Sequence, residues 1–327
     1  MTGWGRILLA SVALTSVVGG TAVWSQFTTD IAAAKARVAQ GSTVIDTPCG
    51  LIEYQAAGTG PVLLAVHGSG GGFDQGMAFA APLVTQGIRV VALSRFGYLR
   101  TPMPADGSAE AQADAFVCLM DALDIDRAAI MGGSAGALSA LQMALRHPDR
   151  VSALILVVPL GYRPPDQAQS VEPMARWVEA AMMRVIGSDF LFWTGLHIAR
   201  DQMIATVVAT PLAVVAAASP AEQARVNASL DAILPVSARA AGLRADTAAG
   251  KSMTPIDLAR SSAPTLIVSA RDDGYGTYAS AEYMAGQIKG ARFLGFETGG
   301  HAWAGHNDEV MAAISTLVLS TQPPTAP

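Results

Sequence analysis

The stretch "MGGSAGA", residues 131–137, decides the fold. It follows an apolar run and precedes an Ala/Leu-rich stretch with helical periodicity. Its centre, "GGSAG", fits the pattern G-x-S-x-G, in which a serine occupies a sharp strand-to-helix turn. Small residues must flank such a serine because the turn leaves no room for larger side chains. Ser134 is therefore a candidate nucleophile, and the alternative is a glycine-rich turn with no catalytic role.

The sequence around this turn predicts a parallel sheet. Near-continuous apolar runs, which suit strands buried on both faces, lie at residues 61–68, 89–95, 128–134, 151–159, 264–270 and 291–298. Stretches of helical period separate the first four runs, at residues 73–86, 109–123 and 137–146. This alternation predicts an α/β fold with a doubly wound, mostly parallel sheet. Residues 43–58 alternate like a hairpin with its turn at Cys49 and Gly50.

A long helical-looking insertion separates Pro159 from Pro264. It leaves the sheet at the C-terminal end of a strand, where open α/β sheets place their binding crevice. We therefore expect a helical cap at residues 160–250, inserted before the last strands of a core formed by residues 43–159 and 251–319. The polar, Pro-rich tail at residues 320–327 is expected to be disordered.

The N-terminus is predicted to be a membrane-targeting segment. After one early cation, Arg6, the chain is uncharged as far as Phe27. Residues 1–27 fit either a signal peptide or an uncleaved signal anchor that just spans a bilayer. We favour a membrane-anchored protein with a juxtamembrane helix or linker at residues 28–42. An exported or periplasmic protein is the alternative if the segment is cleaved.

Composition excludes several classes of function. The chain has 327 residues, a net charge of −5 and scattered basic residues, so a nucleic-acid partner is not expected. It contains neither a CxxC nor an HExxH pattern, and we expect no metal site and no cofactor. Cys49 and Cys118 are expected to be free thiols with structural roles. The oligomeric state stays open.

A serine nucleophile needs a base, and histidine is the usual one. The base must lie on a loop at the C-terminal edge of the sheet, where Ser134 emerges. Of the five histidines, His301 in "ETGGHAW" meets this condition, since it directly follows the last apolar run. His306, at the start of the final helical stretch, is the fallback, although a helix-capping role suits it better.

An acid that orients the histidine is expected on another such loop. "LIVSARDDGYG" places Asp272 and Asp273 just past a predicted strand. An Asp-rich turn is the structural alternative, but the chain order Ser, Asp, His fits a nucleophile-elbow hydrolase. We prefer Asp273 as the acid and keep Asp272 as the alternative.

The loop "HGSGGGFDQG", residues 67–76, completes the predicted site. A glycine-rich loop after a central strand can present bare backbone N–H groups to a developing oxyanion. The predicted donors are the N–H of Ala135, next to the nucleophile, and that of Ser69 or Gly70. Arg95 and Asp74 nearby are expected to make structural ion pairs or hydrogen bonds.

From about residue 43 to residue 319 the chain resembles the α/β-hydrolase superfamily. "HGSGGGFDQG", "SRFGYLRTPMP", "GGSAG", "RDDGYGT" and "GGHAW" match the landmarks of that family in order. The resemblance implies Ser134 as nucleophile, His301 as base and Asp273 as acid. A serine at the nucleophile position argues against the dehalogenase and epoxide hydrolase branches. "GGSAG" is similar to the "GGSWG" of proline iminopeptidases but lacks the Trp, which argues against a peptidase.

The cap sequence suggests an apolar substrate. It is poor in charge and carries the candidate pocket residues Trp177, Phe190, Phe192 and Trp193, which could equally pack the cap's own core. We therefore expect a serine hydrolase that cleaves small apolar or aromatic carboxylic esters through an acyl-enzyme. A C–C bond hydrolase or a lactonase would use the same three residues. A non-catalytic receptor on the same fold is the remaining alternative.

Overall fold

The computed structural model describes residues 3–164, 184, 187–251 and 253–321, with side chains from residue 19 onward. Its centre is an eight-stranded sheet of order β1-β2-β4-β3-β5-β6-β7-β8. The strands are β1 (Thr43–Thr47), β2 (Gly50–Ala57), β3 (Val62–Val66), β4 (Arg89–Leu93), β5 (Ala128–Gly133), β6 (Val151–Val157), β7 (Thr265–Ala270) and β8 (Arg292–Phe296). β2 pairs antiparallel with β1 and β4, and every other pairing is parallel, which confirms the predicted fold class.

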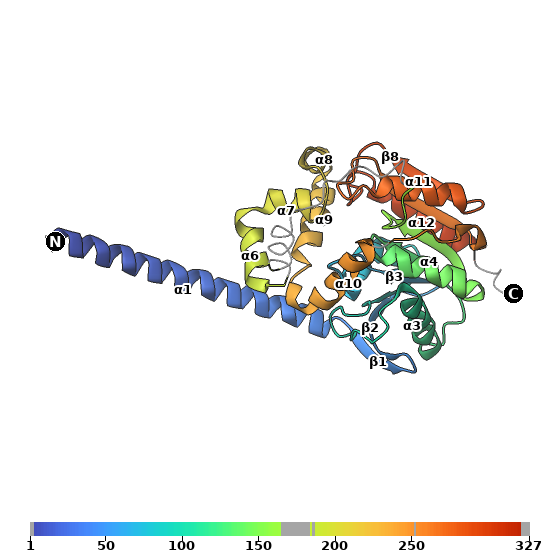
Figure 1. The fold of residues 1–327 in the computed structure, drawn as a ribbon, viewed down its shortest axis with the longest axis horizontal. Helices are drawn as coiled ribbons and strands as arrows, with labels where there is room; N and C mark the ends of the chain where they lie inside the picture. Colours follow the sequence, from blue (N-terminus) through green and yellow to red (C-terminus); the bar gives the residue numbers. More distant parts are fainter. Residues whose placement is uncertain (1–2, 165–183, 185–186, 252, 322–327) are drawn as a thin grey trace.

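Helices cover both faces of the sheet (Figure 1). One face packs against α3 (Ala109–Ala122), α4 (Gly136–Arg146) and α11 (Thr277–Gln287). The other packs against α2 (Phe73–Val84) and α12 (Asn307–Ser320). Every residue of β5, β6 and β7 is buried, because each of these strands has apolar neighbours on both faces. This explains why the sequence showed continuous apolar runs there instead of alternation.

The insertion between β6 and β7 forms a helical cap. Its helices are α6 (Asp189–Ile198), α7 (Arg200–Thr206), α8 (Leu212–Ala217), α9 (Pro220–Asp231) and α10 (Ala240–Lys251), with a 3-10 turn at Val236–Arg239. Further 3-10 turns lie at Pro148–Arg150 and Leu258–Arg260. The cap has a hydrophobic cluster of its own, which includes Phe192, Trp193, Val226 and Leu230. Its last helix ends one residue beyond the expected boundary at 250.

The N-terminal helix α1 (Gly3–Gln40) projects from the rest of the molecule (Figure 1). It runs without a break across the expected boundary between residues 27 and 28. Its C-terminal part packs on the cap, where Phe27 and Ile31 join the cap's hydrophobic cluster. Within the part of the chain whose side chains are described, no helix is long and apolar enough to cross a membrane. The membrane anchor at residues 1–27 is therefore not confirmed and stays a prediction.

The prediction of two free thiols is wrong, since Cys49 and Cys118 form a disulfide. Cys49 lies at the β1–β2 hairpin turn, as expected, and Cys118 lies on α3. The hairpin forms one edge of the sheet, and its first strand, β1, contacts α3. The two cysteines are 69 residues apart in the chain, so only the packing of the hairpin on the helix reveals their proximity.

Removing this disulfide is expected to lower the free energy of unfolding. Closing a loop of this length restricts the unfolded chain, and its loss in a Cys49→Ser variant costs about 4 kcal/mol on a chain-entropy model. Denaturant unfolding with and without a reductant measures the effect. Reduction of the unaltered chain should give the stability of the variant, and an unchanged unfolding midpoint after reduction would contradict the prediction.

Candidate active site

Ser134 occupies the turn between β5 and α4, in an unusual backbone conformation. Its φ of 49° lies in the left-handed region, which a residue with a side chain rarely adopts. Its N–H donates to the carbonyl of Val157 at 2.9 Å, and its carbonyl accepts from the N–H of Leu160 at 3.0 Å. These bonds to the end of the neighbouring strand and to the residues after it hold the turn. Such strain at a strand-to-helix turn is the geometry of a nucleophile elbow.

The flanking glycines are needed for close packing. A Cβ on Gly136 would lie 2.3 Å from the carbonyl oxygen of His67, and one on Gly132 would lie 2.7 Å from the Cα of Ala137. Both approaches are far too short for any side chain. The small residues around Ser134 therefore allow α4 to begin directly against the loop that follows β3.

The structure brings Asp273 and His301 together. The Nδ1 atom of His301 lies 2.8 Å from Oδ2 of Asp273, whose side chain is buried. Asp273 also accepts hydrogen bonds from the Thr277 hydroxyl and from the N–H of Tyr275. Burial alone would raise the pKa of Asp273, but the charge of His301 and these hydrogen bonds bring it below its usual value. The carboxylate is thus ionised at neutral pH and fixes the ring of His301.

Asp272 and His306 lie in other environments. Oδ1 of Asp272 accepts a hydrogen bond of 2.7 Å from the N–H of Gly300, so this side chain ties the acid loop to the histidine loop. The ring of His306 stacks on Phe296, with 3.9 Å between centroids, at the start of α12. Of the alternatives raised by the sequence, only Asp273 hydrogen-bonds His301 among the described residues. Ser134 makes no hydrogen bond with His301 there; catalytic contacts of this kind often tighten only when substrate binds.

A short segment of the cap, residues 207–210, contacts both the loop of Asp273 and the loop of His301. The carbonyl oxygen of Ala209 accepts hydrogen bonds from the N–H of Gly274 at 3.0 Å and from that of His301 at 3.2 Å. The hydroxyl of Thr210 accepts from the N–H of Ala302 at 3.0 Å. Sequence reasoning missed this segment, because it lies in the insertion and carries no periodic or compositional signal.

The loop after β3 carries the backbone N–H groups that the sequence predicts as oxyanion donors. Oε1 of Gln75 accepts from the N–H of Gly68 at 2.9 Å and fixes the start of the loop. The N–H groups of Ser69 and of Ala135, which is 2% exposed, donate to no acceptor among the described residues. The N–H of Gly70 faces the hydroxyl of Tyr98 and lowers its pKa, against the larger effect of burial, which raises it. Ser69 and Gly70 therefore both stay candidates for the second oxyanion donor, and we favour Ser69.

His67 is a buried structural ring. Its Nδ1 lies 2.7 Å from the carbonyl of Gly68, and its Nε2 accepts from the N–H of Arg95 at 2.9 Å. A ring nitrogen facing a carbonyl must carry the proton, which defines the tautomer. Burial, followed by the charge of Arg95, lowers the pKa of His67 well below its usual value. The neutral ring links the glycine-rich loop after β3, residues 68–72, to the loop after β4.

Arg95 and Asp74 both make ion pairs, but not with each other. Arg95 forms a bidentate ion pair with Asp246 on α10, with N–O distances of 2.8 and 2.6 Å. Oδ2 of Asp246 also accepts from the hydroxyl of Ser69 at 2.8 Å. Asp74 pairs with Arg239 of the cap at 2.8 Å. Two carboxylate–arginine pairs therefore connect the cap to the loops of the core around the site.

Two of the predicted pocket residues lie in the cap's own core, which is the alternative that the sequence raised. Phe192 and Trp193 are buried in the cap cluster, and the ring of Phe190 packs against Phe27 of α1. Trp177 lies outside the described residues. A cavity of about 230 Å³ lies elsewhere, between α3, α4 and α11, and includes neither Ser134 nor His301. Among the described residues, no group of three or more His, Cys, Asp or Glu could hold a metal ion.

The fold and this arrangement of a strained serine, a His–Asp pair and a glycine-rich loop define an α/β-hydrolase. A family model described as "alpha/beta hydrolase fold" matches residues 61–303, more than half of the chain. The chain therefore belongs to the α/β-hydrolase fold family.

Curated relatives match a part of the chain. It is 39% identical over 112 residues to a 2-hydroxy-6-oxononadienedioate/2-hydroxy-6-oxononatrienedioate hydrolase of Paraburkholderia xenovorans, covering 32% of this chain and 39% of the relative. It is 34% identical over 116 residues to a 2-hydroxy-6-oxo-6-phenylhexa-2,4-dienoate hydrolase of Comamonas testosteroni, covering 34% and 41%. The matched region thus spans about two fifths of the length of these relatives.

Solved structures match nearly the whole chain. An α/β-hydrolase fold protein from Nakamurella multipartita has a TM-score of 0.65 and 26% identity, covering 86% of this chain and 100% of that one. A bacterial membrane phospholipase A has a TM-score of 0.63 and 21% identity, covering 97% and 99%. The second likeness concerns the fold alone.

Proposed function

We propose that the chain is a serine hydrolase that cleaves small apolar carboxylic esters, with Ser134 as nucleophile, His301 as base and Asp273 as the orienting acid. The observation that carries the proposal is the hydrogen bond between His301 and the buried, ionised Asp273. This pair extends from loops that follow β7 and β8, at the same edge of the sheet as the turn that carries Ser134.

Each residue has a defined part in the proposed reaction. His301 takes the hydroxyl proton of Ser134 as the serine oxygen forms a bond to the ester carbonyl carbon. The carbonyl oxygen, now an anion, accepts hydrogen bonds from the N–H groups of Ala135 and Ser69. The intermediate collapses, the alcohol leaves with the proton held by His301, and the acyl group stays on Ser134. Water then attacks with His301 as base and releases the acid.

Charge pairing around the site favours an uncharged substrate. The names of the curated relatives describe dienoate and dienedioate substrates, which carry carboxylates. A buried carboxylate needs a cation to balance it. The buried arginines of the described residues, Arg95 and Arg239, already pair with Asp246 and Asp74. Because neither arginine is free to bind a substrate carboxylate, an uncharged ester is the favoured substrate. The activity named for the curated relatives makes C–C bond hydrolysis the second candidate.

A substrate panel with active-site labelling tests the proposal. The chain should react with a fluorophosphonate probe at Ser134, located by mass spectrometry, and hydrolyse p-nitrophenyl esters of short and medium acyl chains. A 2-hydroxy-6-oxo-dienoate should be cleaved more slowly than the best ester. Cleavage of the dienoate with no ester turnover would transfer the assignment to C–C bond hydrolysis. Absence of both labelling and turnover would contradict a hydrolase.

We also infer that the protein works in an oxidising compartment. The disulfide between Cys49 and Cys118 supports this, since disulfides persist outside the reducing cytoplasm. Such a location agrees with the signal-like residues 1–27. Whether that segment is retained as an anchor or cleaved stays a prediction.

A further inference from the structure

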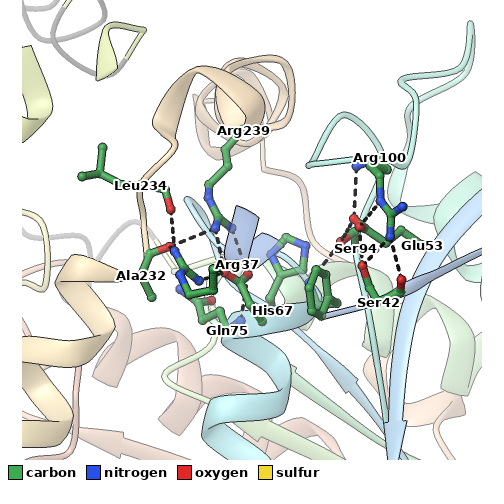
Figure 2. A network of polar contacts seen from close by, with 12 residues as sticks. Arg37, Ser42, Glu53, His67, Gln75, Ser94, Arg100, Ala232, Leu234 and Arg239 are labelled. Carbon is green, nitrogen blue, oxygen red and sulfur yellow. Dashed lines mark hydrogen bonds and ion pairs between the residues drawn. The ribbon is translucent and has the colours of Figure 1, made fainter. Parts of the chain in front are cut away.

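We infer that Arg37 of α1 is a positioning residue for the oxyanion loop, residues 68–72, so that the N-terminal helix contributes to the reaction rate at Ser134. The inference rests on the proposed function, because it assumes that this loop supplies an oxyanion donor. Two chains of contacts start at the Arg37 guanidinium, which lies beside Ala232 and Leu234 in Figure 2.

The first chain of contacts runs through the start of α2. Nη1 of Arg37 lies 2.7 Å from Oδ2 of Asp74, which also binds Arg239 at 2.8 Å. Oδ1 of Asp74 accepts from the backbone N–H of Gln75 at 3.0 Å. The side chain of Gln75 in turn holds the N–H of Gly68 at 2.9 Å. Arg37 therefore anchors the turn that sets the first residue of the oxyanion loop.

The second chain of contacts runs through the cap. Nη2 of Arg37 donates to the carbonyls of Ala232 and Leu234, at 3.1 and 2.6 Å. The residue between them, Ile233, lies against the loop: a Cβ on Gly70 would meet its side chain at 3.8 Å. Arg37 thus fixes a cap segment on both sides of a residue that packs on the middle of the oxyanion loop. The two chains of contacts reach the loop at its first residue and at its middle.

Arg37 can be substituted without leaving a buried charge unpaired. Arg239 is fully buried and depends on Asp74 for its counter-charge, so loss of Asp74 would leave a buried cation unpaired. Loss of Arg37 leaves the pair between Asp74 and Arg239 intact. The Arg37 side chain is 41% exposed, and a partly exposed ion pair of this kind contributes little to stability. Its substitution should therefore preserve the fold.

The comparison of three variants tests the inference. In Arg37→Met, kcat for a p-nitrophenyl ester should fall by about tenfold with KM changed less than about twofold, because small misplacement of a catalytic donor is costly. An interaction used only in the transition state lowers kcat and kcat/KM equally. Arg37→Lys should recover part of the rate. Lys35→Met, which removes an exposed cation of the same helix, should behave like the unaltered chain. The rate of fluorophosphonate labelling should follow kcat.

The remaining outcomes overturn the inference. A wild-type kcat in Arg37→Met would show a contact that matters only for structure, even if the melting temperature falls. An equal loss in Lys35→Met would assign the effect to the charge of α1 in general. The Ser134→Ala variant separates the two proposals. If that variant keeps the ester turnover of the unaltered chain, the proposed function fails and this inference with it. If that turnover depends on Ser134 and Arg37→Met is unaffected, only the inference fails.

Discussion

Replacing Ser134 by alanine is expected to lower kcat for p-nitrophenyl esters by about 10⁵-fold or more, the loss that follows when a triad nucleophile is removed. The remaining rate comes from binding and the oxyanion donors, which still accelerate attack by water about 10³-fold over solution. Initial rates and fluorophosphonate labelling measure the loss, and labelling should disappear entirely. The variant keeps the small side chain that the turn requires, so its circular dichroism and melting temperature should match those of the unaltered chain.

Ser139→Ala is the matched control for this variant. Ser139 lies on α4, the helix that follows the Ser134 turn, and among the described residues its buried hydroxyl donates only to the carbonyl of Gly136, at 3.2 Å. Its loss should leave most of the activity. Substantial ester turnover by Ser134→Ala would remove Ser134 from the mechanism, and an equal loss in both variants would point to damage of the helix instead.

Asp273→Asn is expected to lower kcat by about 10⁴-fold, the loss found when the acid of a triad becomes a neutral amide. The amide cannot stabilise a protonated His301, and it can present a donor where the ring needs an acceptor. The amide oxygen at the Oδ1 position can still accept from the Tyr275 N–H, and the Thr277 hydroxyl can accept from the amide NH2 at the Oδ2 position, so the loop should keep its shape. Steady-state kinetics at neutral pH measure the effect, with circular dichroism as a check of the fold.

Asp272→Asn separates the two adjacent acids. Its remaining carbonyl oxygen can still accept from the N–H of Gly300, so the contact between the loops survives. We expect a loss of less than about tenfold, typical of a slightly displaced catalytic group. If Asp272→Asn lost more activity than Asp273→Asn, the role of acid would pass to Asp272.

The architecture of the core follows from local patterns in the chain. The apolar runs at β5, β6 and β7 are continuous because both faces of these strands are buried, and that property is visible residue by residue. The carboxyl ends of parallel strands share one edge of the sheet. The predicted loops with Ser134, Asp273 and His301 could therefore be assigned to that edge before the structure was known.

The contacts that support the site could not be predicted in this way. Arg37, Asp246 and Thr210 reach the catalytic loops from α1 and from the cap, across long stretches of sequence. Their partners are fixed by how helices pack on one another, which leaves no period or spacing in the sequence. The same holds for the disulfide between Cys49 and Cys118.

The Ala209 carbonyl has a consequence for anyone who wishes to change the specificity of this enzyme by grafting. One backbone oxygen of the cap receives the N–H groups of both Gly274 and His301. A chimera that takes its whole insertion from another hydrolase would exchange this acceptor along with the cap helices. The transplant should therefore leave residues 207–210 native and join the foreign segments on either side of them. For such a design, residues 207–210 belong with the core that carries the catalytic loops, although they lie within the cap insertion. Only the rest of the cap can be exchanged.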